Sequence, residues 1–373
     1  MEKVKEPLLS NDFFKILPPI AIISLIFSHV CIYPPVMTAT PNFANINWLL
    51  ADIGNSSFNF GVPLFLMLVG SFLQENWRIR EFLEDRFWGM ATPLIFFSIL
   101  LTVLVIIICG FHPELMNFFG IKSFTVLGFY DLFKSVFFAQ SWFSTQYSYM
   151  WLIFGVYLFL PILKSWVQNT PLREAEYFLV IWLIVCLLKS TFNIDLALYI
   201  NYFMGPIGFV ILGYYLMNTR WKIFNNKNFG LVLFILMSIL LPILSPAISP
   251  GNDITIFNRY SVYMILQSAG LFIFLKNATS IYKKENKNRL YYKFLMHLSK
   301  ITIGIFLMYE FIIGIIMKVY FTPSNFYYMS WICFFIAFII PYLIMLIFSK
   351  TPYLKNLVGV VRKNPLVYIN DYI

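Results

Sequence analysis

Long apolar stretches separated by short polar segments run along the whole chain. Several of them approach or exceed the roughly 20 residues that a helix needs to cross a bilayer. Strands of a membrane barrel alternate in polarity over about ten residues, whereas residues 95–109 are almost continuously apolar. The pattern therefore predicts an all-α fold, a polytopic membrane helical bundle of about ten transmembrane helices that forms one integral-membrane domain over residues 1–373. The expected spans are about 14–33, 57–74, 91–110, 150–166, 177–193, 196–217, 229–248, 259–276, 299–322 and 327–349.

Composition agrees with this fold class. Hydrophobic residues make up 60% of the chain and charged residues only 12%, against about 25% charged in an ordinary soluble domain, which excludes a water-soluble enzyme. The four cysteines stand singly, without CxxC or CxxH spacing. Neither a disulfide framework nor a zinc site is therefore expected, and we predict no metal.

The net charge of +10 gains meaning only when the basic residues are placed. If the N-terminus is cytoplasmic, all but five of the 27 Lys and Arg residues fall on the inner side. The five exceptions are Lys122, Lys134, Lys189, Arg259 and Lys318. Because cytoplasmic loops carry the excess of Lys and Arg, we predict that both termini are cytoplasmic in a multi-pass protein of the inner (plasma) membrane. The positive charge then indicates membrane lipid as the partner, and no nucleic acid.

Two ionisable residues fall inside predicted spans, where a charged group is costly. His29 comes some fifteen residues into the first span, roughly 20 Å deep at about 1.5 Å per residue. It is a candidate catalytic base, or a helix-end imidazole satisfied by a neighbouring carbonyl or water. Glu310 lies about mid-span and must face the protein interior. It is a candidate to orient an imidazole, to receive a proton or to pair with a cation in the bundle.

Three arginines, Arg78, Arg80 and Arg86, follow the second predicted span on the inner side. Guanidinium groups suit phosphate, although an ordinary positive-inside loop has the same composition. The chain has no Walker sequence, GxGxxG, GxSxG or HExxH. ATP-driven transport, Rossmann cofactors, serine hydrolysis and zincin chemistry therefore have no support.

One run along the second predicted span, Gly61 to Leu73 (GVPLFLMLVGSFL), resembles the GVPLFFxxSGxLL signature of the membrane acyltransferase-3 family. Three further pieces follow in the family's order: residues 86–93, 150–163 and 213–216. The chain also resembles the subgroup that contains the enterobacterial-common-antigen O-acetyltransferase, and residues 198–201 and 298–305 extend that likeness.

This resemblance implies a ten-helix enzyme that takes an acyl group, usually acetyl from cytoplasmic acetyl-CoA, to a hydroxyl of a cell-surface glycan or its lipid-linked (undecaprenyl-linked) saccharide precursor. Acyl-CoA is then a substrate, with no cofactor bound permanently. His29 falls at the position of the family's central histidine, where it would act as general base or carry the acyl group. Arg78, Arg80 and Arg86 would hold the CoA phosphates, with Arg86 at the family's basic position.

The chain departs from the family pattern at several polar positions. Pro18 stands where the family usually has an arginine, Tyr149 lies in a segment that lacks the family's histidine, and Tyr309 replaces another histidine. Either Tyr149, Tyr309 and Glu310, with Trp151, form a rebuilt acceptor pocket, or the protein has lost catalysis. The retained His29 favours the first interpretation. A proton-coupled transporter or flippase, and a non-catalytic scaffold of polysaccharide assembly, remain alternatives.

Overall fold

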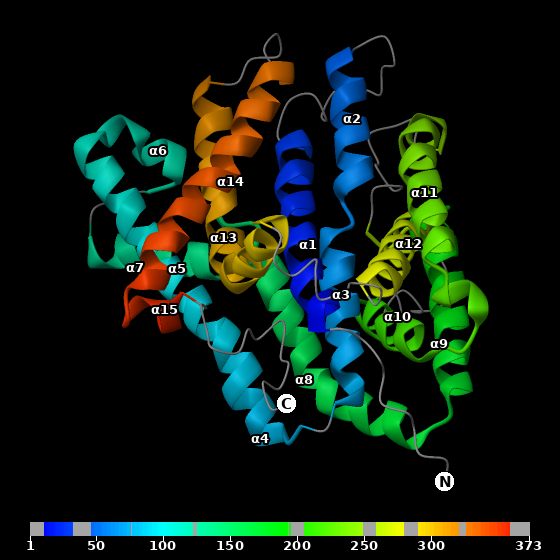
Figure 1. The fold of residues 1–373 in the computed structure, drawn as a ribbon. Helices are drawn as coiled ribbons and strands as arrows, with labels where there is room; N and C mark the ends of the chain where they lie inside the picture. Colours follow the sequence, from blue (N-terminus) through cyan, green and yellow to red (C-terminus); the bar gives the residue numbers. More distant parts are fainter. Residues whose placement is uncertain are drawn as a thin grey trace.

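The computed structural model describes residues 11–32, 46–75, 77–121, 125–192, 194, 205–248, 259–279, 290–320 and 326–358. These residues form helices and connecting turns (Figure 1), and no strand occurs among them. The helices are α1 (Asn11–Ile32), α2 (Ile46–Phe58), α3 (Gly61–Ser71), α4 (Ile79–Phe82), α5 (Trp88–Phe111), α6 (Met116–Phe119), α7 (Val126–Phe137), α8 (Tyr147–Asn169), α9 (Leu172–Val185), α10 (Ile207–Asn218), α11 (Lys227–Ile248), α12 (Val262–Thr279), α13 (Leu290–Tyr320), α14 (Phe326–Lys350) and α15 (Leu354–Leu357).

Eight helical segments within these ranges are long and apolar enough to cross a membrane. They are Asp12–Cys31, Leu49–Gln74, Trp88–Phe111, Tyr147–Asn169, Lys227–Leu244, Val262–Thr279, Leu290–Met317 and Tyr328–Lys350. The predicted polytopic helical bundle is thus confirmed. The other two expected spans overlap α9, which continues as a π-helical turn from Cys186 to Thr191, and α10, which has 12 residues. Residues 198–201, part of the family resemblance, lie outside the described residues, as does Lys122.

Helix α1 lies in the middle of the bundle (Figure 1). It packs against α2 and α3 on one side and against α13 and α14 on the other. Its side chains are accordingly buried over most of its length, and Leu17, Ile22 and Leu25 have no exposed surface. His29 lies three residues before the end of α1. Because this helix is surrounded by other helices, the His29 side chain contacts protein.

Glycines in the family-like segment allow helices to approach closely. A Cβ atom at Gly70 of α3 would overlap the backbone carbonyl of Val210 in α10, and one at Gly213 of α10 would overlap the carbonyl of Met67. A Cβ at Gly61 would lie 2.6 Å from the carbonyl oxygen of Ala21 in α1. These glycines therefore allow the backbone of α3 to contact the backbones of α1 and α10.

Candidate active site

The imidazole of His29 lies in a cluster of polar side chains from α1, α8 and α13. Its Nδ1 is 2.9 Å from the Tyr309 hydroxyl oxygen and 3.5 Å from Glu310 Oε2. Its Nε2 is 3.4 Å from the hydroxyl oxygen of Tyr149. The side chains of His29 and Glu310 are 12% and 8% exposed. The structure thus brings together four of the residues that the sequence singles out, although they are up to 281 positions apart along the chain.

The Glu310 carboxylate is held by the start of α8. The backbone N–H of Gln146 donates to Oε2 at 2.8 Å, and the Thr145 hydroxyl donates to Oε1. The side-chain amide of Gln146 also donates to the Leu307 carbonyl at 3.1 Å, which ties this helix start to α13. A helix N-terminus carries partial positive charge, so it stabilises an ionised carboxylate. The start of α8 therefore fixes the position of the Glu310 carboxyl group beside His29.

These contacts give the two ring nitrogens of His29 different surroundings. Nδ1 faces the Glu310 carboxylate and the Tyr309 hydroxyl, which favours a proton on Nδ1. Nε2 then has a free lone pair directed to the Tyr149 hydroxyl. A neutral imidazole that is oriented through Nδ1 by a carboxylate can accept a proton at Nε2, the arrangement that general-base catalysis requires.

Arg259 is a part of the cluster that sequence reasoning missed. Its Nη2 donates to the Tyr149 hydroxyl oxygen at 3.3 Å, and its guanidinium carbon lies 4.6 Å from the centre of the Tyr149 ring. The available signal was its place among the few basic residues on the predicted outer side. Thr145 and Gln146, which hold Glu310, gave no comparable signal because neither residue type is unusual at a helix start.

The three arginines predicted to lie on the inner side are placed differently from one another. Arg86 is buried, with only 4% of its side chain exposed; its Nη2 donates to Glu75 Oε2 at 2.7 Å, and its guanidinium lies over the Phe72 ring. Arg80 is 88% exposed and pairs with Glu84 at 2.7 Å, and Arg78 is also exposed. The structure therefore separates Arg86 from the other two. Burial raises the pKa of the Glu75 carboxyl, and the Arg86 charge opposes that rise.

Trp151 is not in this cluster. Its indole N–H donates to the Phe137 carbonyl at 2.8 Å, and its ring stacks on Phe138 with 5.4 Å between centroids. Trp151 thus joins α8 to the end of α7. It follows Tyr149 by two residues on α8, but its side chain is directed toward α7. Among the described residues, no group of three or more His, Cys, Asp and Glu side chains is arranged to hold a metal ion.

A comparison with protein families decides the identity at the family level. The model of the acyltransferase-3 family, described as an acyltransferase domain, matches residues 19–350. The chain belongs to this family. No curated protein matches it, and no solved structure does.

Membership in the acyltransferase-3 family indicates the class of reaction that this protein catalyses. An acyltransferase-3 protein is a membrane acyltransferase, so this chain moves an acyl group from a donor to an acceptor. The matched range begins within α1 and ends at the end of α14, and it contains His29, the Glu310 carboxylate and the residues that hold them.

Proposed function

We propose that this protein is a membrane O-acyltransferase that moves an acyl group, acetyl above all, from cytoplasmic acyl-CoA to a hydroxyl of a cell-surface or undecaprenyl-linked glycan. The observation that supports it best is the oriented His29 imidazole inside the bundle, with Nδ1 against Glu310 and Nε2 against Tyr149. The inner-membrane location with both termini cytoplasmic follows from the distribution of Lys and Arg. The likeness to the enterobacterial-common-antigen subgroup supports a polysaccharide acceptor.

In the proposed reaction His29 acts as general base. The sugar hydroxyl attacks the thioester carbonyl carbon while Nε2 takes its proton; a C–O bond forms and, through a tetrahedral intermediate, the C–S bond breaks. The imidazolium then gives its proton to the departing CoA thiolate. Glu310 stabilises the transient imidazolium, and the Tyr149 hydroxyl, polarised by Arg259, donates to the oxyanion of the intermediate.

The CoA phosphates are assigned to the inner side of the protein. Arg78 and Arg80 are exposed and offer guanidinium groups for phosphate. Arg86 already binds Glu75, so in this proposal it contacts CoA only by exchanging that partner. Tyr149 and Tyr309 border the acceptor hydroxyl, and Trp151 holds α7 beside it.

Radiolabelled acetyl-CoA tests the proposal with purified protein and an extracted lipid-linked glycan fraction. Wild-type protein is expected to release CoA and to label the glycan, and His29→Ala to lose both by at least about 100-fold. His112→Ala is the matched control, because His112 is an exposed histidine paired with Glu114 outside the cluster, and it should keep full activity.

The alternative functions predict different results. Proton-dependent solute uptake without loss of the thioester would indicate a transporter or flippase. A scaffold would leave glycan acetylation unchanged in His29→Ala cells, while deletion of the whole protein would change glycan amount or length. Either result would refute the acyltransferase mechanism.

A further inference from the structure

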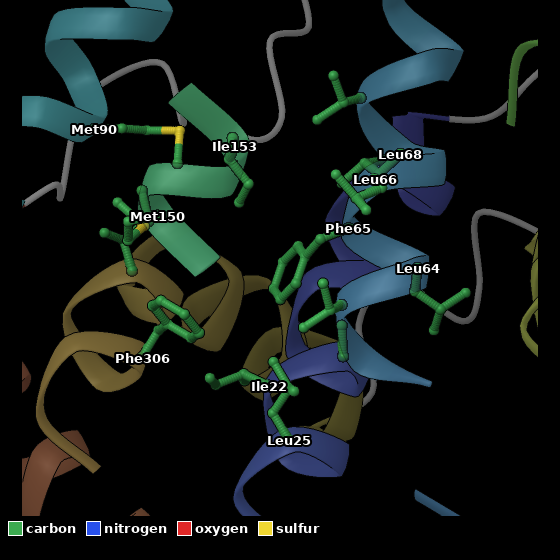
Figure 2. Close-up of a cluster of buried hydrophobic side chains, with 14 of the residues drawn as sticks. Ile22, Leu25, Leu64, Phe65, Leu66, Leu68, Met90, Met150, Ile153 and Phe306 are labelled. Carbon is green, nitrogen blue, oxygen red and sulfur yellow. The ribbon is translucent and has the colours of Figure 1, made fainter. Parts of the chain in front are cut away.

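A small apolar cavity lies beside the His29 cluster. Leu25 of α1, Phe65 of α3, Ile153 of α8 and Phe306 of α13 line it, and the ring of Tyr149 forms part of its wall. Figure 2 shows Phe65, Phe306 and Leu25 around this space, with Met150 and Ile153 of α8 beside them. We propose that this cavity receives the hydrocarbon end of the donor acyl group and restricts the enzyme to acetyl or a similarly short chain. The inference rests on the proposed function and specifies its donor.

The position of the cavity follows from helix periodicity. Leu25 lies one turn before His29 on the same face of α1, and Phe306 lies one turn before Glu310 on the same face of α13. Ile153 lies one turn after Tyr149 on α8, which runs in the opposite direction to α1. Each helix therefore presents a polar residue to the cluster and an apolar residue to the cavity below it. The cavity lies on the side where α1 and α13 begin, the side predicted to face cytoplasmic acyl-CoA.

The surface that faces the cavity is entirely apolar, although Tyr149 and Thr302 contribute to it. Both hydroxyls are engaged elsewhere: that of Tyr149 with His29 and Arg259, and that of Thr302 with the Leu298 carbonyl at 2.9 Å. A small space without polar partners holds water poorly, because a water molecule needs about two to four polar partners. It suits neither a sugar hydroxyl nor a phosphate, and an aliphatic group is the part of the two substrates that matches it.

The size of the cavity limits the length of that group. It leaves about 20 Å³ of room for a water-sized group, and roughly 10–15 Å³ on this measure is needed for a single water molecule. One methyl group fits this space, whereas the propyl tail of a butyryl group requires the wall to move. Interior packing resists such movement. The cavity borders the ring of Tyr149, and the hydroxyl of that residue contacts His29 Nε2. In this proposal the carbonyl attached to the methyl group therefore lies on the side of the cavity toward the His29 cluster.

The test compares acetyl-CoA with butyryl-CoA in the full-length protein. Wild-type kcat/KM is expected to favour acetyl-CoA by about ten-fold or more, the discrimination typical of one or two methylenes that do not fit. Ile153→Ala and Ile303→Ala each remove wall carbons from a different helix and should raise the butyryl-to-acetyl ratio by about ten-fold. This ratio does not depend on the fraction of active protein, so partial misfolding does not imitate the effect.

Ile211→Ala is the matched control, since Ile211 is fully buried in α10 and does not line the cavity. Its ratio should stay at the wild-type value. Equal use of both donors by wild-type protein, or the same ratio change in all three variants, would overturn the cavity assignment while the acyltransferase function stands.

Binding measurements separate the two proposals further. Unreactive analogues of acetyl-CoA and butyryl-CoA, with a methylene group in place of the thioester sulfur, are ketones without a leaving group, and they report donor affinity without turnover. If wild-type protein consumes no acyl-CoA but binds the acetyl analogue more tightly, and both cavity variants lose that preference, the proposed function fails and the cavity assignment holds. Equal affinities for the two analogues in wild-type protein would refute the assignment.

Discussion

At the residue scale, the contacts around Glu310 explain how a carboxylate is maintained inside an apolar bundle. One oxygen accepts from the Thr145 hydroxyl, and the other accepts from the Gln146 backbone N–H. A buried charge is tolerated when hydrogen bonds satisfy it. The carboxylate is then available to orient His29 and to stabilise its protonated form.

Glu310→Gln tests this role. The neutral amide keeps the size of the side chain but loses the negative charge, so the imidazolium is no longer stabilised. We expect kcat for acetyl-CoA to fall by about 100-fold or more, with a small change in KM because the donor is not bound by Glu310. Glu114→Gln is the control, because Glu114 is an exposed carboxylate that pairs with His112. An unchanged kcat in Glu310→Gln would contradict the orienting role.

Arg259 and Tyr149 should act as a unit. Arg259→Gln and Tyr149→Phe are each expected to lower kcat by about 10- to 100-fold, and the double variant to be little worse than Tyr149→Phe alone, since Arg259 acts through the Tyr149 hydroxyl. Steady-state kinetics of the three variants measure this coupling. Arg220→Gln changes an exposed arginine and should have no effect. Fully multiplicative losses would show that the two side chains act independently.

The Arg86–Glu75 pair should matter for stability more than either exposed arginine. Arg86→Gln leaves Glu75 without its hydrogen-bonded cation, which is expected to cost about 1–3 kcal/mol. Arg80→Gln should leave the stability nearly unchanged, because an exposed ion pair contributes little. Thermal unfolding in detergent measures both. Equal melting temperatures for the two variants would contradict the structural role of Arg86.

The same pair predicts a pH dependence. Burial raises the folded-state pKa of Glu75 above its unfolded value, so its contribution to stability is full at pH below about 4.5 and is lost as pH rises through the folded-state pKa. Arg86 opposes this rise. Without Arg86 the loss grows, so the stability deficit of Arg86→Gln should be larger at pH 7 than at pH 4.5.

Several residues of the site were predictable from sequence, and others were not. His29 and Glu310 stand out because an ionisable side chain is costly within an apolar span. Arg259, Thr145 and Gln146 do not stand out, since their role depends on which distant helix lies beside them. For the same reason the sequence grouped Arg86 with its exposed neighbours, whereas tertiary packing pairs it with Glu75.

At the scale of the helices, the crossing of α3 and α10 depends on two glycines. Gly70→Ala or Gly213→Ala places a methyl group against a backbone carbonyl that cannot rotate away, so the helices must separate. We expect a loss of about 1–3 kcal/mol and a lower melting temperature. At Gly155 of α8 an added Cβ meets nothing within 4 Å, so Gly155→Ala should be neutral or stabilising by about 0.5–1 kcal/mol. A destabilised Gly155→Ala with a neutral Gly70→Ala would contradict this packing argument.

The helix positions were predicted well where apolar residues are continuous, and less well where polar residues are paired. Helix α2 precedes most of the span expected at 57–74, and it carries buried Asp52 and Asn55. Asn55 accepts a hydrogen bond from the Ser28 hydroxyl of α1 at 3.0 Å. Hydrogen bonds of this kind allow polar residues inside the bundle. A hydropathy pattern does not predict them, so it placed the start of this span too late in the sequence.

At the scale of the whole molecule, the charge distribution predicts how the protein sits in the membrane. The start of α5 and the end of α8 lie with α4 at one end of the bundle, and α6 lies away from that end (Figure 1). Because Lys and Arg favour the cytoplasm, we expect Arg80 of α4 to face the cell interior and Glu114, just before α6, to face the exterior.

Single introduced cysteines test this orientation, since the native Cys31, Cys109, Cys186 and Cys333 are all buried. An impermeant maleimide added to intact spheroplasts should label Glu114→Cys and leave Arg80→Cys unlabelled until the membrane is opened. The opposite labelling pattern would reverse the orientation and place the donor side of the proposed site outside the cell.

The apolar lining next to Tyr149 also affects how much acetyl-CoA is lost to hydrolysis. Thioesters hydrolyse when water reaches the carbonyl in the presence of a base, and His29 would serve that side reaction as readily as the intended one. Because the Tyr149 and Thr302 hydroxyls are already engaged, the lining offers a water molecule no hydrogen-bond partner on that side. Hydrolysis of acetyl-CoA in the absence of glycan should therefore be slow, even though His29 is oriented to act as a base.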